Sequence, residues 1–178
     1  TRAMREEQFR KSLKKAFQDI SKNLHHTVSV VSPDGKILLQ SIWGLPSDNV
    51  QHQCEIFVAM PFGGDLDELY RTFLEPFLTK EVHKNTKRGD DFSQVYAPIL
   101  HDIWSAIYNC QYVLTECTNR NPNVFYELGI AHTLGKDAIL ITQSSDDIPK
   151  VLCLYRYVLY EDTGYGIDIL KAELLKIL

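Results

Sequence analysis

The sequence lacks the features that would place it in a membrane, secreted or zinc-binding class. It has no apolar run approaching the length of a membrane-spanning helix, no signal-peptide pattern and no N-x-[ST] sequon. Its four cysteines, Cys54, Cys110, Cys117 and Cys153, form no C-x-x-C pair, and none has zinc-finger spacing to a histidine pair. We therefore predict free thiols in a reducing, cytoplasmic compartment, with no metal site and no membrane association.

An excess of basic residues is also missing. The chain has 19 Lys and Arg against 23 Asp and Glu, which gives a net charge of −4. This balance argues against non-specific binding to nucleic acid or to an anionic membrane, because both need a basic face. With 178 residues, of which 44% are hydrophobic and 24% charged, the chain is of a size and composition typical of one globular domain with a small appendage.

Residues 44–52 (GLPSDNVQH) are rich in turn-forming and polar residues and divide the chain. Before them, apolar residues at three- and four-residue steps predict an amphipathic helix over residues 5–24. Asp34-Gly35 between two aliphatic runs then predicts a β-hairpin. We therefore predict a helix and hairpin appendage at residues 1–50 and a main domain at residues 53–178.

The main domain alternates short apolar runs with helical patterns. Apolar runs predict buried strands at residues 54–60, 112–114, 138–142 and 155–160. Helical periodicity predicts helices at residues 65–79, 96–109, 121–135 and 167–178, with Pro76 kinking or shortening the first. This alternation indicates an α/β fold with a mostly parallel sheet, whose ligands bind at the carboxyl ends of the strands.

The first of these strand ends carries the loop Met60-Pro61-Phe62-Gly63-Gly64. Backbone amides of a glycine pair before a helix could cradle a phosphate or a sugar hydroxyl. The loop is neither a Walker A motif nor a G-x-G-x-x-G motif, and a simple tight turn explains the same residues.

Glu127 is the first candidate for chemistry. It lies six residues after the helix-capping Asn121 (127 − 121 = 6) and beside the apolar stripe of its helix. Burial would raise the pKa of its carboxyl, while the helix dipole would favour the ionised form that a nucleophile needs. A solvated or capping glutamate is the alternative.

A second carboxylate, Asp102, starts the preceding helix and could donate a proton to a leaving group, as in glycoside hydrolysis. Asp90-Asp91 lie shortly before it, and all three could equally be surface aspartates. Arg88 and Arg120 lie on loops where they could meet a phosphate, but exposed arginines are the common case. We interpret the scattered histidines, His101 and His132 among them, as core or surface residues.

Three segments resemble the nucleoside 2-deoxyribosyltransferase-like superfamily. They are CEIFVAMPF (residues 54–62), KRGDDFSQVYAPILHDIWSAI (87–107) and YVLTECTNRNPNVFYELGIAHTLGK (112–136), and the likeness continues through TQSSDDIP (142–149) to cover residues 54–178. The resemblance implies a flavodoxin/Rossmann-like fold, with helices on both faces of the sheet. It also implies that Glu127 attacks C1′ of the sugar and that Asp102 assists the base, with no cofactor.

The resemblance also implies a set of substrate-binding positions, and the sequence departs from the family at three places. Phe57 stands where a tyrosine is common, and Asn121 where an aspartate contacts substrate. Glu116-Cys117 replace the usual Asp-Leu. The predicted substrate-binding residues are Phe57, Met60, Pro61, Phe62, Gly63, Arg88, Asp91, Asn121 and Asn123.

Several functions fit these residues. The leading one is an N-glycosidase or deoxyribosyltransferase acting on a nucleoside or nucleotide. The alternatives are a TIR-like NAD glycohydrolase, in a bacterial defence system for example, a nucleotide-binding sensor without turnover, and a scaffold whose residues 1–50 recruit a protein partner. Since transferases of this family often complete the pocket from a neighbouring subunit, a homo-oligomer is also expected.

Overall fold

The computed structural model describes residues 30–31, 37–38, 42–47, 49–92 and 99–178. The chain divides into two units, Thr1–Leu45 and Pro46–Leu178. In the first unit, β1 (Val30–Val31) pairs antiparallel with β2 (Ile37–Leu38), as the predicted hairpin requires. The predicted helix over residues 5–24 lies outside the described residues.

The second unit is built on a five-stranded sheet in which every pair of neighbours is parallel. Its strands are β3 (Ile56–Ala59), β4 (Thr86–Arg88), β5 (Tyr112–Glu116), β6 (Asp137–Thr142) and β7 (Tyr157–Leu159). Their order in the sheet is β4-β3-β5-β6-β7. This confirms the predicted flavodoxin/Rossmann-like α/β class. The order of the strands reverses between β3 and β5, where ligands bind in folds of this kind.

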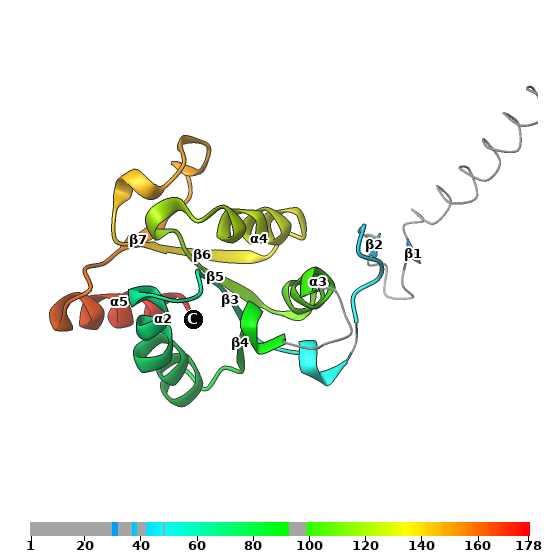
Figure 1. Ribbon diagram of the computed structural model, residues 1–178, viewed down its shortest axis with the longest axis horizontal. Helices are drawn as coiled ribbons and strands as arrows, with labels where there is room; N and C mark the ends of the chain where they lie inside the picture. Colours follow the sequence, from blue (N-terminus) through cyan, green and yellow to red (C-terminus); the bar gives the residue numbers. More distant parts are fainter. Residues whose placement is uncertain (1–29, 32–36, 39–41, 48, 93–98) are drawn as a thin grey trace, which may run out of the picture. The chain divides into compact units, whose positions relative to one another are not determined.

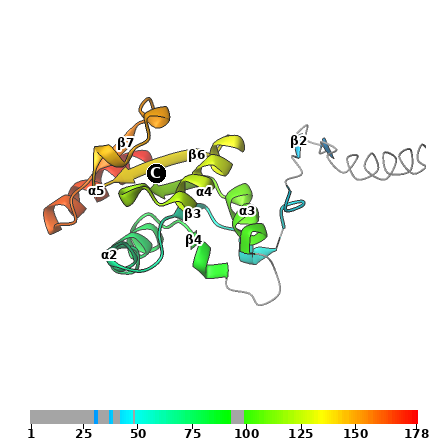
Figure 2. The same cartoon turned by 45° about the horizontal axis from the view of Figure 1, so that its top comes forward.

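Helices cover both faces of this sheet (Figures 1 and 2). They are α2 (Asp65–Leu69), α3 (Ile99–Asn109), α4 (Pro122–Thr133) and α5 (Gly164–Ile177). Because side chains of a strand alternate, Ile56 and Val58 of β3 pack on the side of α2 and α5. Phe57 and Ala59 pack on the other side, against α3 and α4. Buried aliphatic side chains on both faces thus hold the domain together.

Two helices show how local sequence sets their ends. Asn121 caps α4: its side chain accepts a hydrogen bond from the Asn123 N–H at 2.9 Å, and Pro122 occupies the first turn. The chain leaves α4 through Gly135, which has a φ of +67°. The helix that starts with α2 continues beyond Pro76 as far as Glu81, through two segments with wider π-type turns at Tyr70–Leu74 and Phe77–Glu81.

Within the described ranges, no helix combines the length and the apolar character that crossing a membrane requires.

Candidate functional site

The parallel topology gathers the predicted site residues at one edge of the sheet, with one exception. Residues 60–64 follow β3, residues 89–92 follow β4, and residues 117–121 follow β5, so all three loops lie at the carboxyl edge. Phe57 is the exception, because it lies in the middle of β3 and is fully buried in the core beneath α3 and α4.

Glu127 lies on α4, on the side that faces α3. One turn to either side of it, Val124 and Ala131 pack in the same apolar cluster as Ile103 and Ile107 of α3. The Glu127 side chain is half-buried, and it makes no hydrogen bond or ion pair with any described residue. Burial therefore raises the pKa of its carboxyl to about 8.

Asp102 lies in the first turn of α3 and is only 4% exposed. Its Oδ1 is 2.9 Å from Nε2 of His52, and Nδ1 of His101 lies 3.8 Å away. His52 belongs to a short turn, Val50–His52, in the turn-rich segment before β3. The structure thus gives Asp102 a buried histidine partner that no motif in the sequence indicated.

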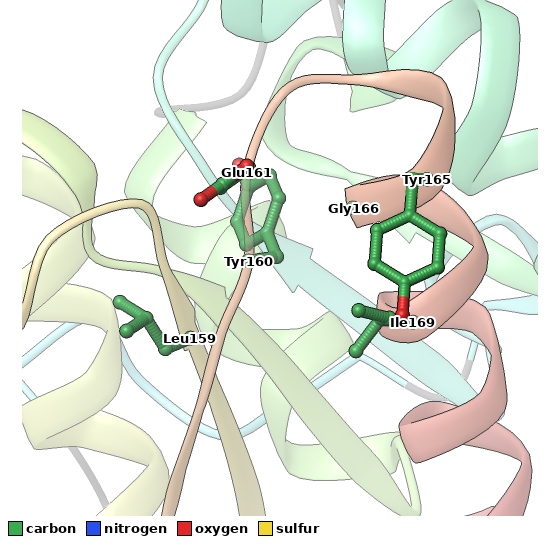
Figure 3. A pocket seen from close by; sticks show the side chains of 6 residues that line it. All are labelled: Leu159, Tyr160, Glu161, Tyr165, Gly166 and Ile169. Carbon is green, nitrogen blue, oxygen red and sulfur yellow. The ribbon is translucent and has the colours of Figure 1, made fainter.

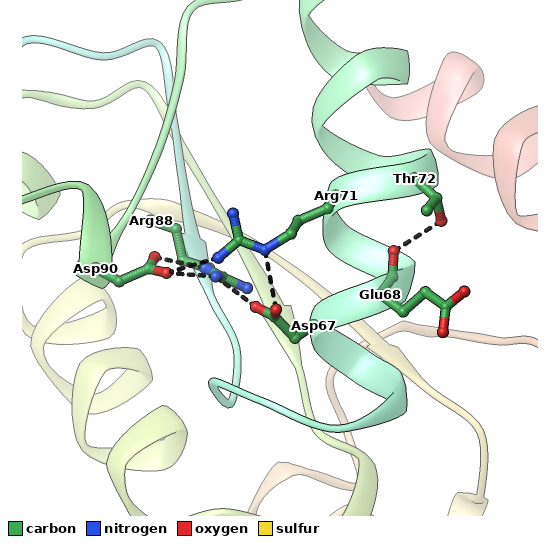
Figure 4. A network of polar contacts seen from close by, with 6 residues as sticks. All are labelled: Asp67, Glu68, Arg71, Thr72, Arg88 and Asp90. Atoms are coloured by element: carbon green, nitrogen blue, oxygen red, sulfur yellow. Dashed lines mark hydrogen bonds and ion pairs between the residues drawn. The ribbon is translucent and has the colours of Figure 1, made fainter.

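Arg88, at the end of β4, is the centre of an ionic network (Figure 4). Its Nη2 lies 2.6 Å from Oδ1 of Asp67 and 2.5 Å from Oδ2 of Asp90. Arg71 also reaches Asp67, at 2.9 Å, and Asp90, at 3.5 Å. Hydrogen bonds to Arg71 and Arg88 lower the pKa of the Asp67 carboxyl. The network joins α2 to the loop after β4, across the edge where the site was predicted.

The loop after β3 rests on the same arginine. The Phe62 ring, 54% exposed, has its centroid 5.2 Å from Cζ of Arg88. It also lies against Gly89, where an added Cβ would come within 3.1 Å of the ring. Gly63 and Gly64 follow with φ of +80° and +69°, a conformation that glycine adopts without strain. Asp91 accepts a hydrogen bond from the Arg88 backbone N–H at 2.7 Å.

Glu116, at the end of the central strand β5, is the centre of a buried hydrogen-bond network. It is fully buried, and its carboxylate accepts hydrogen bonds from the Tyr160 hydroxyl at 2.6 Å and from the Thr118 N–H at 2.8 Å. Burial outweighs these two bonds and raises the pKa of Glu116 to about 7. Gln143 donates to the same hydroxyl at 3.2 Å, which links the ends of β5, β6 and β7.

The loop from β5 to α4 is held from the other side by the loop after β6. The Asn119 N–H donates to Asp147 at 3.0 Å, and the Arg120 guanidinium donates to the Asp146 carbonyl. Arg120 is exposed. Both Asn119 and Arg120 have left-handed backbone conformations, with φ of 62° and 52°. Together with Glu116, these contacts fix the start of α4, and therefore the helix that carries Glu127.

A cavity of about 190 Å³ lies near this network, between the end of β7 and α5 (Figure 3). It is lined by Leu159, Tyr160, Glu161, Tyr165, Gly166 and Ile169. Apart from the Glu161 carboxylate and the Tyr hydroxyls, its walls are apolar. Among the described residues, no group of three or more histidine, cysteine, aspartate or glutamate side chains could hold a metal ion.

Comparisons with known proteins give relatives in structure only. No family model matches the sequence, and no curated protein matches it. Several solved structures share the fold, among them one TIR domain and two enzymes. The TIR domain of the Toll-related receptor TRR-2 from Hydra magnipapillata is 15% identical, with a TM-score of 0.56, and the match covers 70% of this chain and 97% of that domain.

The other two structures are enzymes by their names. The CMP N-glycosidase BcmB of Clostridium botulinum is 17% identical, with a TM-score of 0.51, and the match covers 69% of this chain and 98% of that one. The 2-deoxyribosyltransferase of Bacillus psychrosaccharolyticus is 16% identical, with a TM-score of 0.52 and coverage of 65% and 89%. The resemblance seen in the sequence motifs is therefore supported at the level of the fold.

Proposed function

We propose that this protein cleaves or transfers the N-glycosidic bond of a nucleoside or nucleotide. The observation that carries the proposal is Glu127, a half-buried carboxylate without a described partner beside α3. A carboxylate that is half-buried and unpaired costs stability, so its presence suits a reactive group better than a structural one. A fold shared with an N-glycosidase and a deoxyribosyltransferase supports this interpretation.

In the proposed reaction the ionised Glu127 carboxylate attacks C1′ of the sugar. The bond from C1′ to the base nitrogen breaks, and its electron pair leaves with the base, which Asp102 assists by hydrogen bonding or protonation. Water, or a second base, then takes the sugar from Glu127 and restores the carboxylate. The transition state resembles an oxocarbenium ion, which a nearby carboxylate stabilises.

The remaining predicted residues are proposed to bind substrate. The backbone of Met60, Pro61, Phe62 and Gly63 would line one side of the pocket, and Asn121 and Asn123 would meet the sugar hydroxyls. Phe57 is fully buried in the core and would support the site without touching substrate. A phosphate would have to displace Asp67 or Asp90 to reach Arg88 directly. We therefore propose that Arg88 acts on the substrate through Phe62 and Asp91, which it holds in place.

A second candidate is the cleavage of NAD to nicotinamide. The match to a TIR domain over 70% of the chain favours it, because a TIR-like NAD glycohydrolase is one of the functions that fit the sequence. The chemistry at C1′ is the same, and only the leaving base differs.

The test is base release from a panel of nucleosides, deoxynucleosides, their monophosphates and NAD, measured by liquid chromatography with mass detection. We expect release by the wild type and by the matched control Glu68→Gln, whose glutamate is exposed on α2, but not by Glu127→Gln. Release of nicotinamide alone would select the NAD glycohydrolase. A compound that raises the melting temperature without releasing base would point to a nucleotide sensor, and equal release by Glu127→Gln would overturn the role of Glu127.

A further inference from the structure

Residues 46–47 and 49–53, near the start of the second unit, pack against α3. Ser47 makes two of the contacts: its N–H donates to Ser105 Oγ at 2.9 Å, and its carbonyl accepts from Asn109 Nδ2 at 2.9 Å. His52 makes a third, to Asp102. These contacts attach the segment to the helix that carries the proposed base-assisting aspartate.

The His52 ring is held in one orientation. The side chain is 7% exposed, and its ring centroid lies 5.6 Å from that of Phe92. The backbone N–H of His52 donates to the Asn49 carbonyl at 2.9 Å, and the Asn49 side chain accepts from the backbone N–H of Gln51. These two hydrogen bonds form a compact turn that fixes the backbone at His52. The fixed turn and the Phe92 ring hold the imidazole where its Nε2 lies 2.9 Å from Oδ1 of Asp102.

The contacts of the two ring nitrogens decide which one carries the proton. Nδ1 is buried and has no hydrogen-bond partner among the residues that the structure describes. Nε2 lies 2.9 Å from Oδ1 of Asp102, a good hydrogen-bond distance. A neutral His52 therefore carries its hydrogen on Nε2 and donates it to Asp102, because a carboxylate can only accept.

We propose that His52 is a positioning residue for Asp102 in the reaction given above, and the inference therefore rests on that proposed function. By donating to Oδ1, His52 fixes the rotation of the carboxylate and leaves Oδ2 for the leaving base. Oδ1 accepts this hydrogen bond whether or not Oδ2 carries a proton, so the pairing leaves Asp102 able to hydrogen-bond or to protonate the base through Oδ2. Binding of the substrate relies less on this geometry than departure of the base does, so the effect falls on kcat rather than on KM.

The test compares base release by four single variants and one double variant. His52→Leu keeps an apolar side chain but removes the donor, whereas His52→Gln keeps an N–H that can reach Asp102. We expect His52→Leu to lower kcat by roughly a hundredfold with little change in KM, as misplacing a catalytic group does, and His52→Gln to recover most of this loss. His83→Asn, an exposed histidine at a φ of 57°, is the matched control, since asparagine tolerates that conformation.

A double-mutant cycle with Asp102→Ala separates positioning from other roles of the ring. If His52 acts through Asp102, adding His52→Leu to Asp102→Ala lowers kcat no further. An equal, additional loss in the double variant overturns the proposal, and so does a folded His52→Leu with the kcat of the wild type. Thermal melting shows which variants fold. Should His52→Leu not fold, His52→Gln takes its place in the cycle with Asp102→Ala.

Histidine side-chain nitrogen spectra test the pair without turnover. We expect the His52 proton on Nε2, exchanging slowly with water, and the loss of this slow exchange in Asp102→Ala. A His52 proton on Nδ1 overturns the inference even where base release depends on Glu127. Absence of base release from the wild type, or release that survives in Glu127→Gln, instead refutes the proposed function and with it a role for His52 in that reaction.

Discussion

Replacing Glu127 by glutamine is expected to stabilise the protein at neutral and alkaline pH. In the folded chain, burial raises the pKa of this carboxyl from 4.5 to about 8. The folded state therefore holds the Glu127 proton more tightly than the unfolded state does. Between pH 4.5 and 8 the unfolded chain binds fewer protons, so stability falls as the pH rises through this window. Glutamine has nearly the same shape and no charge, so the variant does not lose this stability as the pH rises.

The size of the effect follows from the two pKa values. Each pH unit between the two pKa values corresponds to about 1.36 kcal/mol. The raised pKa of Glu127 therefore lowers the free energy of unfolding of the wild type by about 1 kcal/mol at pH 5, about 3 kcal/mol at pH 7 and about 4 kcal/mol at pH 8. We therefore expect Glu127→Gln to change the free energy of unfolding little at pH 5. At pH 8 we expect the variant to be more stable than the wild type by about 3–4 kcal/mol.

Urea unfolding at pH 5, 6, 7 and 8 measures this difference directly. The wild type is compared with Glu127→Gln and with the exposed control Glu68→Gln, which should follow the wild type at every pH. Glu116, whose pKa is about 7, adds its own loss of stability with rising pH, but it is present in all three proteins and cancels in the difference. If the free energies of unfolding of Glu127→Gln and the wild type differ by the same amount from pH 5 to pH 8, burial does not raise the pKa of Glu127.

Three further outcomes follow from the same structure. Because the attacking carboxylate must be ionised, kcat/KM for base release should rise about tenfold per pH unit and level off near pH 8; a profile that is flat from pH 5 to 8 contradicts a buried nucleophile. Tyr160→Phe removes the hydroxyl that donates to Glu116, so it should lower the free energy of unfolding at pH 8 by about 1–3 kcal/mol, measured in urea; an unchanged value would mean that water replaces the hydroxyl. Gly63→Ala places a side chain at a φ of +80° in open space and should lower the free energy of unfolding by about 1 kcal/mol. Gly129→Ala, which is exposed on α4, should raise it by about 0.5–1 kcal/mol. Melting temperatures of the two variants that shift in the same direction would contradict the conformational explanation.

Much of the fold could be predicted because the signals are local. The apolar runs that became β3, β5 and β6 are visible in the sequence, since strands buried on both faces need consecutive apolar residues. Asn121-Pro122 marks the start of α4 for an equally local reason, the need to satisfy free N–H groups. β4 was missed because it is three residues long, polar and paired only with β3 at the edge, so it carries little apolar pattern.

The candidate site divides in the same way. Glu127 could be singled out from its place beside the stripe of α4, which depends only on helical periodicity. The partners that decide the chemistry come from far along the chain: His52 reaches Asp102 across 50 residues, and Tyr160 reaches Glu116 across 44. No local pattern encodes such pairs, because they exist only once distant strands, helices and turns pack together. The sequence by itself determined the fold class and the candidate nucleophile. Tertiary structure alone decided which carboxylates are buried and what they contact.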